Sequence, residues 1–378
     1  MKVTCLQENL AKGLSIVSRA VASRSTLPVL ANVLIATDQS RLRLAATNLE
    51  LGITCWIGAK VEEEGSTTVP AKTFIDLVNT LPQGTMDMGL NVRTQTLNVR
   101  GGAFVNDIKC IDAQEFPIIP PADLSQGISL NVVDLREMIE HVIFAAATDD
   151  ARPILTGVLV KVEGEKLTFA ATDGFRLSVR TASLSTPARE NVTAIIPARA
   201  LAELARALGD ESEGLVMVLP PGRGQVIFHL KDVEIVSQLI EGNFPDYQHI
   251  IPKSFTTRTV VGTQGFLNAC KAADIFAREN AHTARLKITP GAEMTPGILE
   301  MTAQSAETGS NEAKVDATVD GGGVEVAFNV KYLVDALNVI KTQNVAIETS
   351  TSTAPGVIRP VGGRDDYLYV VMPMRLGK

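Results

Sequence analysis

The carboxylates are the residues in this chain whose types and spacing come closest to a catalytic pattern. Two adjacent acidic pairs, Asp149-Asp150 and Asp365-Asp366, have the oxygen ligands that a hard cation such as Mg²⁺ or Ca²⁺ prefers. Carboxylates in such loops are more commonly solvated than metal-bound. The pairs are the sole support for one interpretation, a three-domain enzyme with its site between domains.

The histidines and cysteines lack the spacing of a metal or redox site. They are His141, His229, His249 and His282, and Cys5, Cys55, Cys110 and Cys270. Structural zinc and redox dithiols need closely paired ligands, which these positions do not supply. The glycine-rich stretches match neither a Walker loop nor a dinucleotide fingerprint. We therefore expect no catalytic residue, no metal site and no cofactor.

Length and charge narrow the classes of protein further. The 378 residues predict two or three domains. A formal charge of −7 argues against a chain coated in basic charge for nucleic acid, although it permits a local basic surface. No apolar run is long enough for a membrane span, and the N-terminus lacks the apolar core of a signal peptide. We therefore expect a cytoplasmic protein without a membrane partner.

Three markers recur along the chain in the same order. Phe116-Pro117, Phe244-Pro245 and Met372-Pro373 follow one another at intervals of 128 residues. The second series is Val69-Pro70-Ala71, Ile196-Pro197-Ala198 and Phe328-Asn329-Val330, and the third is Leu42–Thr47, Leu167–Thr172 and, more faintly, Leu299–Gln304. Such agreement predicts three copies of one domain.

Each copy has the same predicted order of elements. The first element is a strand, such as Lys2 to Cys5 in the first copy. An amphipathic helix follows, and in the first copy it runs from about Leu10 through Val17 and on to Ala22. Hairpin strands and a second helix come next. The second helices are predicted over Ala71–Leu81, Ala198–Leu208 and Val330–Ile340. The fold class is therefore α+β, with helices on one face of antiparallel sheets.

The markers also set the domain boundaries, because Pro-containing linkers follow the first two. We expect domains over residues 1–119, 127–251 and 256–378. The alternating residues up to Val371 predict a strand that must end at Pro373, which has no N–H to donate. No domain follows this third marker. We therefore interpret Met372 and Met374 as part of a surface that binds apolar partners.

The triple repeat, the segment from Ala171 to Leu177 (Ala-Thr-Asp-Gly-Phe-Arg-Leu) and the terminal Val-Met-Pro-Met-Arg-Leu together resemble one family. This family is that of the bacterial sliding clamps, which are the β subunits of DNA polymerase III. The resemblance covers the whole chain and includes Arg24 with the segment from Thr26 to Leu30. It implies three tandem clamp domains and a non-catalytic protein. Two copies would join head to tail in a ring around duplex DNA, with helices inside and sheets outside, to make the replicative polymerase processive.

The resemblance also implies a pocket for short linear peptides from the polymerase III catalytic subunit, the clamp loader, other polymerases and repair proteins. The matching positions are Leu155, Thr172, Gly174, Phe175, Arg176, Leu177, Pro245, His249, Ile250, Asn329, Tyr332, Val370, Val371, Met372, Pro373, Met374, Arg375 and Leu376. Two departures bear on this carry-over. Gly377 and Lys378 extend the chain beyond the usual family terminus, and Phe175 stands where histidine or another aromatic residue is also common.

DNA contacts and subunit contacts are implied in the same way. The DNA contacts are Arg24, Arg152, Arg199 and Arg206, with Lys12 and Lys72. The subunit interface would use Ile108 on one side and Ile275 with Phe276 on the other. The recurring basic residues are equally compatible with solvated helix faces. A peptide-binding scaffold without a DNA role therefore stays open beside the clamp and the enzyme.

Overall fold

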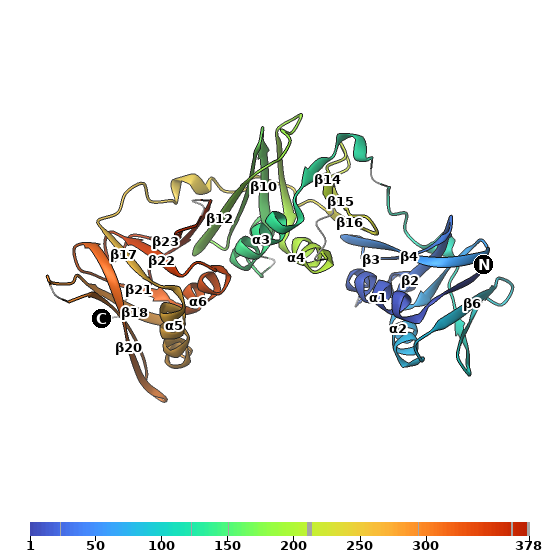
Figure 1. The fold of residues 1–378 in the computed structure, drawn as a ribbon, viewed down its shortest axis with the longest axis horizontal. Coiled ribbons are helices and arrows are strands. Elements are labelled where there is room, and N and C mark those ends of the chain that lie inside the picture. The colour runs from blue at the N-terminus through green and yellow to red at the C-terminus, as the bar shows by residue number, and fades with distance from the viewer. Residues whose placement is uncertain are drawn as a thin grey trace. The chain divides into compact units, whose positions relative to one another are not determined.

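The computed structural model describes residues 1–22, 24–121, 123–149, 151–209, 214–293, 295–363 and 366–375. The predicted site residues Asp150, Asp365 and Leu376, and the terminal Gly377 and Lys378, lie outside these ranges. The chain divides into two compact units (Figure 1), Met1–Val133 with Arg199–Leu239 and Asp134–Ala198 with Ile240–Lys378. Over the described ranges, no helix has both the length and the apolar character needed to cross a membrane.

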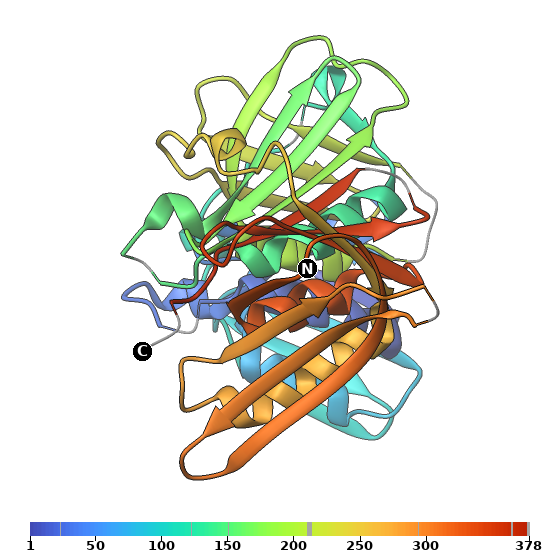
Figure 2. The same cartoon turned by 90° about the vertical axis from the view of Figure 1, so that its left-hand side faces the viewer.

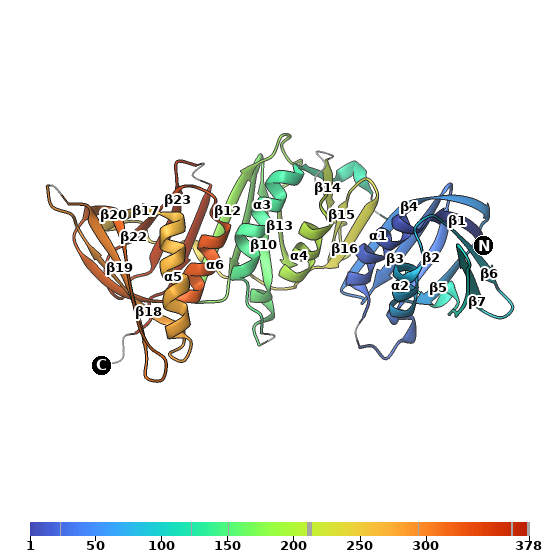
Figure 3. The ribbon, with the colours of Figure 1, turned by 60° about the horizontal axis from the view of Figure 1, so that its bottom comes forward.

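The first unit is built on one twelve-stranded sheet in which each recorded strand pair is antiparallel. Its strands from the first repeat are β1 (Lys2–Leu6), β2 (Asn32–Asp38), β3 (Arg41–Thr47), β4 (Leu51–Glu63), β5 (Ser66–Pro70), β6 (Thr85–Asn91), β7 (Thr96–Gly101) and β8 (Phe104–Lys109). Those from the second repeat are β9 (Ile128–Leu130), β14 (Leu215–Val218), β15 (Gln225–His229) and β16 (Val233–Gln238). The helices are α1 (Gln7–Val17), α2 (Ala71–Thr80) and α4 (Ala198–Ala207), and Figure 3 shows α1 and α2 beside strands β2 to β5.

The two repeats of the first unit meet along one seam in this sheet. Strand β4 pairs with β16, with Ile53 opposite Ile235 and Cys55 opposite Val233. The main path of the sheet runs β8-β7-β6-β1-β4-β16-β15-β14-β9. Backbone hydrogen bonds therefore continue from one repeat into the next.

The second unit has the corresponding sheet, also of twelve strands. Its strands are β10 (Gly157–Glu163), β11 (Lys166–Thr172), β12 (Arg176–Ser183), β13 (Val192–Pro197), β17 (Thr257–Gly262), β18 (Thr283–Thr289), β19 (Gly297–Ser305), β20 (Gly309–Gly321), β21 (Val324–Asn329), β22 (Asn344–Thr349), β23 (Gly356–Val361) and β24 (Tyr367–Val371). The helices are α3 (Val132–Val142), α5 (Thr263–Ala277) and α6 (Val330–Val339). Here the seam is β12 against β24, with Ser178 opposite Tyr369.

Equivalent helices of the repeats pack through equivalent apolar faces. Phe74 and Val78 of α2 are fully buried, and in α6 Leu333 and Leu337 occupy the same helical spacing and are also buried. Figure 2 shows the orange and red strands of the second unit in front of α5 and α6, which pack against each other and against that sheet. Each large apolar side chain buried in this way stabilises the fold by about 1.5–3 kcal/mol.

The observed helix ends differ slightly from the predicted ones. Helices α2, α4 and α6 each end one residue early, because Leu81 and Ile340, for example, are extended caps. The prediction that the first helix continues to Ala22 was wrong. Helix α1 ends at Val17, a 3₁₀ turn follows over Ser18–Ala20, and Val21 is extended. The Ser18 hydroxyl donates to the Ser15 carbonyl, a local bond that competes with a continued helix.

Candidate partner-peptide pocket and nucleic-acid contacts

A tight turn between β11 and β12 forms the centre of the predicted peptide pocket. The Thr172 hydroxyl donates to the Arg176 carbonyl at 2.6 Å, and the Gly174 N–H donates to the Thr172 hydroxyl at 3.0 Å. The Asp173 carboxylate accepts from the N–H groups of Phe175 and Arg176 at 2.9 and 3.1 Å. Gly174 has φ +92°, which favours glycine. The turn presents the Phe175 side chain to solvent, 56% exposed.

Arg176 anchors one wall of the pocket. Its Nε lies 2.9 Å from a carboxylate oxygen of Asp173, and its Nη1 lies 2.7 Å from one of Asp335 on α6. The guanidinium carbon lies 4.3 Å from the centre of the Tyr332 ring, a cation–π arrangement. Burial, followed by the charge of Asp173, raises the pKa of Tyr332. Both carboxylates thus hold the Arg176 guanidinium beside the Tyr332 ring.

The terminal segment forms a second wall. Val370 and Val371 of β24 pair with Leu177 and Arg176. The strand ends at Val371, as predicted, and the Met372 N–H then donates to the Phe175 carbonyl at 2.9 Å. A single bridge joins Pro373 to Phe328, so the chain crosses toward the end of β21 after it leaves the sheet. Met372 remains 37% exposed, while Pro373 and Met374 are half-buried.

The remaining predicted residues border the same region. Leu155 is half-buried and donates its N–H to the Arg152 carbonyl at 2.9 Å. The segment that contains Pro245, His249 and Ile250 is exposed, but its Tyr247 packs into a cluster with Leu177 and Val370. Asn329 caps α6 by accepting from the Lys331 N–H at 3.1 Å. Arg375 is exposed.

Three side chains of this region were not predicted to belong to it. Asp335 was interpreted as part of a solvated helix face, and Asp173 was quoted only within the motif. Arg152 was predicted as a DNA contact, yet its Nη1 donates to the Asp173 carbonyl at 2.7 Å beside Gly174. The aspartate next to Thr172 was the available sequence signal, because Asx side chains commonly build such turns.

The first unit contains the same turn at its own seam. The Thr47 hydroxyl donates to the Leu51 carbonyl at 3.0 Å, and Asn48 Oδ1 accepts from the N–H groups of Glu50 and Leu51. The Gln238 N–H donates to the Glu50 carbonyl at 2.8 Å, as Met372 does to Phe175. The repeats therefore share this turn in atomic detail, although Glu50 and Leu51 stand in place of Phe175 and Arg176.

The predicted DNA contacts are surface cations. Arg24, Lys12, Lys72, Arg199 and Arg206, all in the first unit, are exposed. Arg206 also lies 2.5 Å from Glu203. In the second unit, Arg152 is exposed and pairs with Asp149 at 3.4 Å. All six side chains are exposed, but Arg152 and Arg206 are also held by neighbouring carboxylates. Attraction of such cations to phosphate groups depends on salt rather than on base sequence.

The predicted subunit-interface residues differ in exposure. Ile108 lies on β8, the edge strand of the first sheet, but is only 7% exposed. The exposed apolar residues of that strand are Phe104 and Val105, at 53% and 62%. In the second unit, Ile275 on α5 is 55% exposed and Phe276 is half-buried. The sequence reasoning missed Phe104 and Val105.

Asp149 and Asp366 are the members of the acidic pairs that lie within the described ranges. No group of three or more metal-ligating side chains occurs there. Asp149 pairs with Arg152, and Asp366 pairs with Arg180.

Comparisons with known proteins cover the chain almost from end to end. Residues 1–120 match the N-terminal domain of the DNA polymerase III β subunit, residues 129–246 its central domain and residues 248–375 its C-terminal domain. The chain belongs to the β sliding clamp family. The β sliding clamps of Synechocystis sp. and Synechococcus elongatus are 34% and 35% identical to it, and each match covers 100% of both chains.

Solved clamps have the same fold. The sliding clamp of Bacillus subtilis is 28% identical with a TM-score of 0.93, and that of Pseudomonas aeruginosa is 31% identical with a TM-score of 0.90, each over 100% of both chains. The predicted fold of three tandem clamp domains is confirmed. As a β sliding clamp, the chain is a non-catalytic subunit of DNA polymerase III in DNA replication, and the enzyme interpretation was wrong.

Proposed function

We propose that two copies of this chain close head to tail into a ring that encircles duplex DNA and makes the replicative polymerase processive. The domains would span residues 1–119, 127–251 and 256–378. A two-fold ring of this kind brings the first domain of one copy against the third domain of the other. Ile275, Phe104 and Val105 are exposed apolar side chains on those two domains, and they support this arrangement.

The ring would hold DNA by topology and by weak attraction of phosphates. The chain is acidic overall, which disfavours binding of DNA at arbitrary surfaces. We propose Arg24, Arg152, Arg199 and Arg206 as DNA contacts, with Lys12 and Lys72. The exposure of these side chains supports the proposal. Encirclement would supply the residence time, so individual contacts need not be strong.

The pocket around Thr172–Leu177 and Val370–Met374 would capture short peptides of the polymerase, the clamp loader and repair proteins. The observation that carries this proposal is the exposed pair of Phe175 and Met372 beside the fixed Arg176–Tyr332 wall. A short peptide there is expected to bind at roughly micromolar strength, about 8 kcal/mol. The predicted residues Leu155, Pro245, His249, Ile250, Asn329, Arg375 and Leu376 are proposed as the rest of the site.

The decisive experiment compares retention on closed circular and linear duplexes. A ring loaded by the clamp loader should stay on circular DNA and slide off after linearisation. Equal loss from both would contradict encirclement. Peptide capture without any gain in polymerase processivity on primed circular DNA would instead favour a scaffold without a DNA role.

Removal of the chain from Met372 onward tests the pocket separately. We expect this truncation to abolish peptide binding, measured by fluorescence anisotropy, and to leave the native mass of a dimer unchanged. Loss of the dimer would contradict the separation of the two sites.

A further inference from the structure

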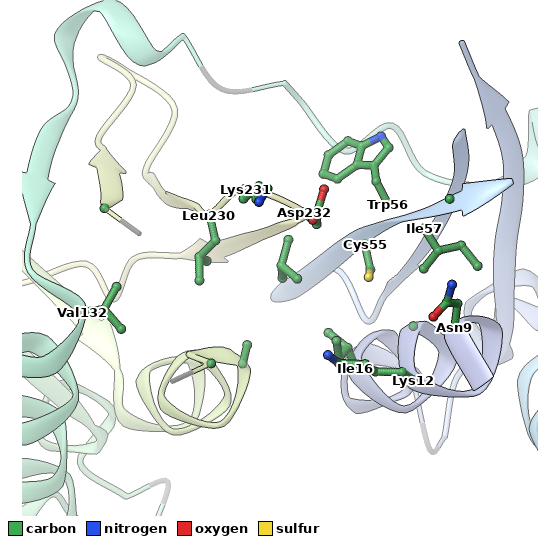
Figure 4. A pocket seen from close by; sticks show the side chains of 16 residues that line it. Asn9, Lys12, Ile16, Cys55, Trp56, Ile57, Val132, Leu230, Lys231 and Asp232 are labelled. Atoms are coloured by element: carbon green, nitrogen blue, oxygen red, sulfur yellow. The ribbon is translucent and has the colours of Figure 1, made fainter. Parts of the chain in front are cut away.

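The first unit contains a cavity of about 360 Å³ beneath the β4–β16 seam. Figure 4 shows Lys12 and Ile16 of α1 on one side of it, with Leu230, Lys231 and Asp232 approaching from the turn between β15 and β16. Cys55 and Trp56 of β4 also line the cavity. Pockets that bind small molecules typically measure about 300–1,000 Å³ and have apolar walls with a few polar groups. This cavity has room for a molecule with one ring.

The corresponding region of the second unit is filled by large side chains. The rings of His141 on α3 and Tyr367 on β24 meet edge to face, with centres 4.5 Å apart. Arg180 of β12 lies beside them, paired with Glu137 at 3.4 Å and with Asp366. Tyr367 is 1% exposed and His141 4% exposed. Two rings and a guanidinium thus occupy the space under the second seam.

The repeat aligns that cluster with the walls of the cavity, position by position. Ile16 is the tenth residue of α1, as His141 is of α3. Val233 pairs with Cys55 across the first seam, as Tyr367 pairs with Arg180 across the second. Small aliphatic and thiol side chains therefore stand where the second unit has rings and a guanidinium. The cavity is the space that those larger groups would fill.

The charges at the cavity favour an anion. Lys12 is the sixth residue of α1 and takes the place of Glu137, the sixth of α3. Asp232 keeps the acidic position of Asp366, but its carboxylate already lies 3.2 Å from Arg41. The side chains of Cys55 and Ile57 point toward Gly13 of α1 and form the apolar wall of the cavity. A ring-sized space beside an exposed lysine suits an aromatic group that carries a carboxylate.

We propose that this cavity is a binding site for small monocyclic aromatic carboxylates. The ring takes the space that the His141 and Tyr367 rings occupy under the other seam, and the carboxylate pairs with Lys12. With few heavy atoms, such a ligand binds with a dissociation constant on the order of 1 mM.

The test uses the full-length protein with phenylacetate as the probe and phenethylamine as its cationic counterpart. Binding is followed by saturation-transfer NMR of the ligand. We expect saturable phenylacetate binding and at least tenfold weaker binding of the amine. Equal affinity for both probes, or no saturable phenylacetate binding at about 10 mM, overturns the proposal.

Two variants test the location. Val233→Tyr places the counterpart of Tyr367 in the cavity, and it should abolish phenylacetate binding because the ring fills the space. Ile16→Phe is the second variant, because Ile16 lines the cavity and stands where α3 has the ring of His141. The matched control is Ile298→Phe, at a partly exposed isoleucine that does not line this cavity. We expect Ile16→Phe to weaken phenylacetate binding at least tenfold and the control to leave it unchanged. Retained binding in Ile16→Phe, or equal loss in the control, overturns the assignment.

Discussion

Asp335→Asn is the substitution that tests how the Arg176 wall contributes to peptide capture. The Asp335 carboxylate lies 2.7 Å from Arg176, and the two side chains are 29% and 10% exposed. A hydrogen bond between charged groups contributes about 1.5–3 kcal/mol, and partial exposure of Asp335 places this one near the lower value. Asparagine keeps the shape of the side chain but removes its charge.

Only part of the free energy of the Asp335–Arg176 hydrogen bond should be lost from the free energy of peptide binding. Asp173 still holds the Nε of Arg176 at 2.9 Å, so the guanidinium keeps part of its orientation over Tyr332. About 1.4 kcal/mol corresponds to a tenfold change in an equilibrium constant. We therefore expect the dissociation constant of a peptide from the polymerase III catalytic subunit to rise about threefold to tenfold.

The assay is fluorescence anisotropy of the dye-labelled peptide with purified full-length protein. Asp274→Asn is the matched control, because Asp274 lies in the same unit and its 22% exposed carboxylate pairs with His282 at 2.6 Å. It should leave the dissociation constant unchanged. An unchanged constant in Asp335→Asn, or an equal rise in Asp274→Asn, would refute the reasoning.

Three further predictions concern charge, pH and thiol chemistry. If Arg199 and Arg206 contact phosphates, changing both to glutamine should make the negative slope of log affinity against log salt shallower by about 1.8. The slope is measured by fluorescence anisotropy with labelled duplex DNA. An unchanged slope would exclude both residues as phosphate contacts. Burial lowers the pKa of His141, so the unfolded chain binds a proton there at a higher pH than the folded protein does. The free energy of unfolding should therefore decrease as the pH falls below about 6.5. His141→Phe should reduce that decrease, measured by urea titrations at pH 7 and 5.5. Burial also raises the pKa of the Cys5 thiol to about 12, and the Cys110 side chain is less buried than that of Cys5. Ellman's reagent at pH 8 should therefore modify Cys110 before Cys5 in the folded protein. The reverse order would contradict this prediction.

The repeat made most of the fold predictable. Three markers that recur in the same order, at intervals of 125 to 132 residues, indicated three domains, and the helix predicted over Ala71–Leu81 is observed as α2. Helix ends were less accessible, because the end of α1 depends on how Ser18 bonds locally. Periodic apolar residues report packing over several turns, whereas a terminus depends on one or two backbone angles.

The candidate site was only partly predictable for a related reason. Thr172 and Phe175 stand in a continuous motif, but Asp335 is 159 residues from its partner Arg176. A helix face with alternating charges has the same sequence pattern whether it faces water or an arginine of another strand. The position of Asp335 became evident only when the β12–β24 seam placed α6 beside the turn.

The cavity in the first unit had a sequence signal that was not used. Aligning α1 with α3 sets Ile16 against His141 and Lys12 against Glu137. The same alignment sets Val233 against Tyr367. A run of smaller residues at corresponding core positions predicts lost volume between the elements, provided that the strand pairing is known.

The shared Thr-Asx turn separates the stability of the seam from the chemistry of its surface. In both units the turn depends on the side chains of the threonine and the Asx residue, while the residue at its tip supplies only backbone groups to it. Phe175 and Glu50 therefore occupy the same backbone with opposite character. The residue at the tip can therefore change during evolution with little effect on folding. One copy of the turn can acquire a side chain that binds a new partner while the other copy keeps its own.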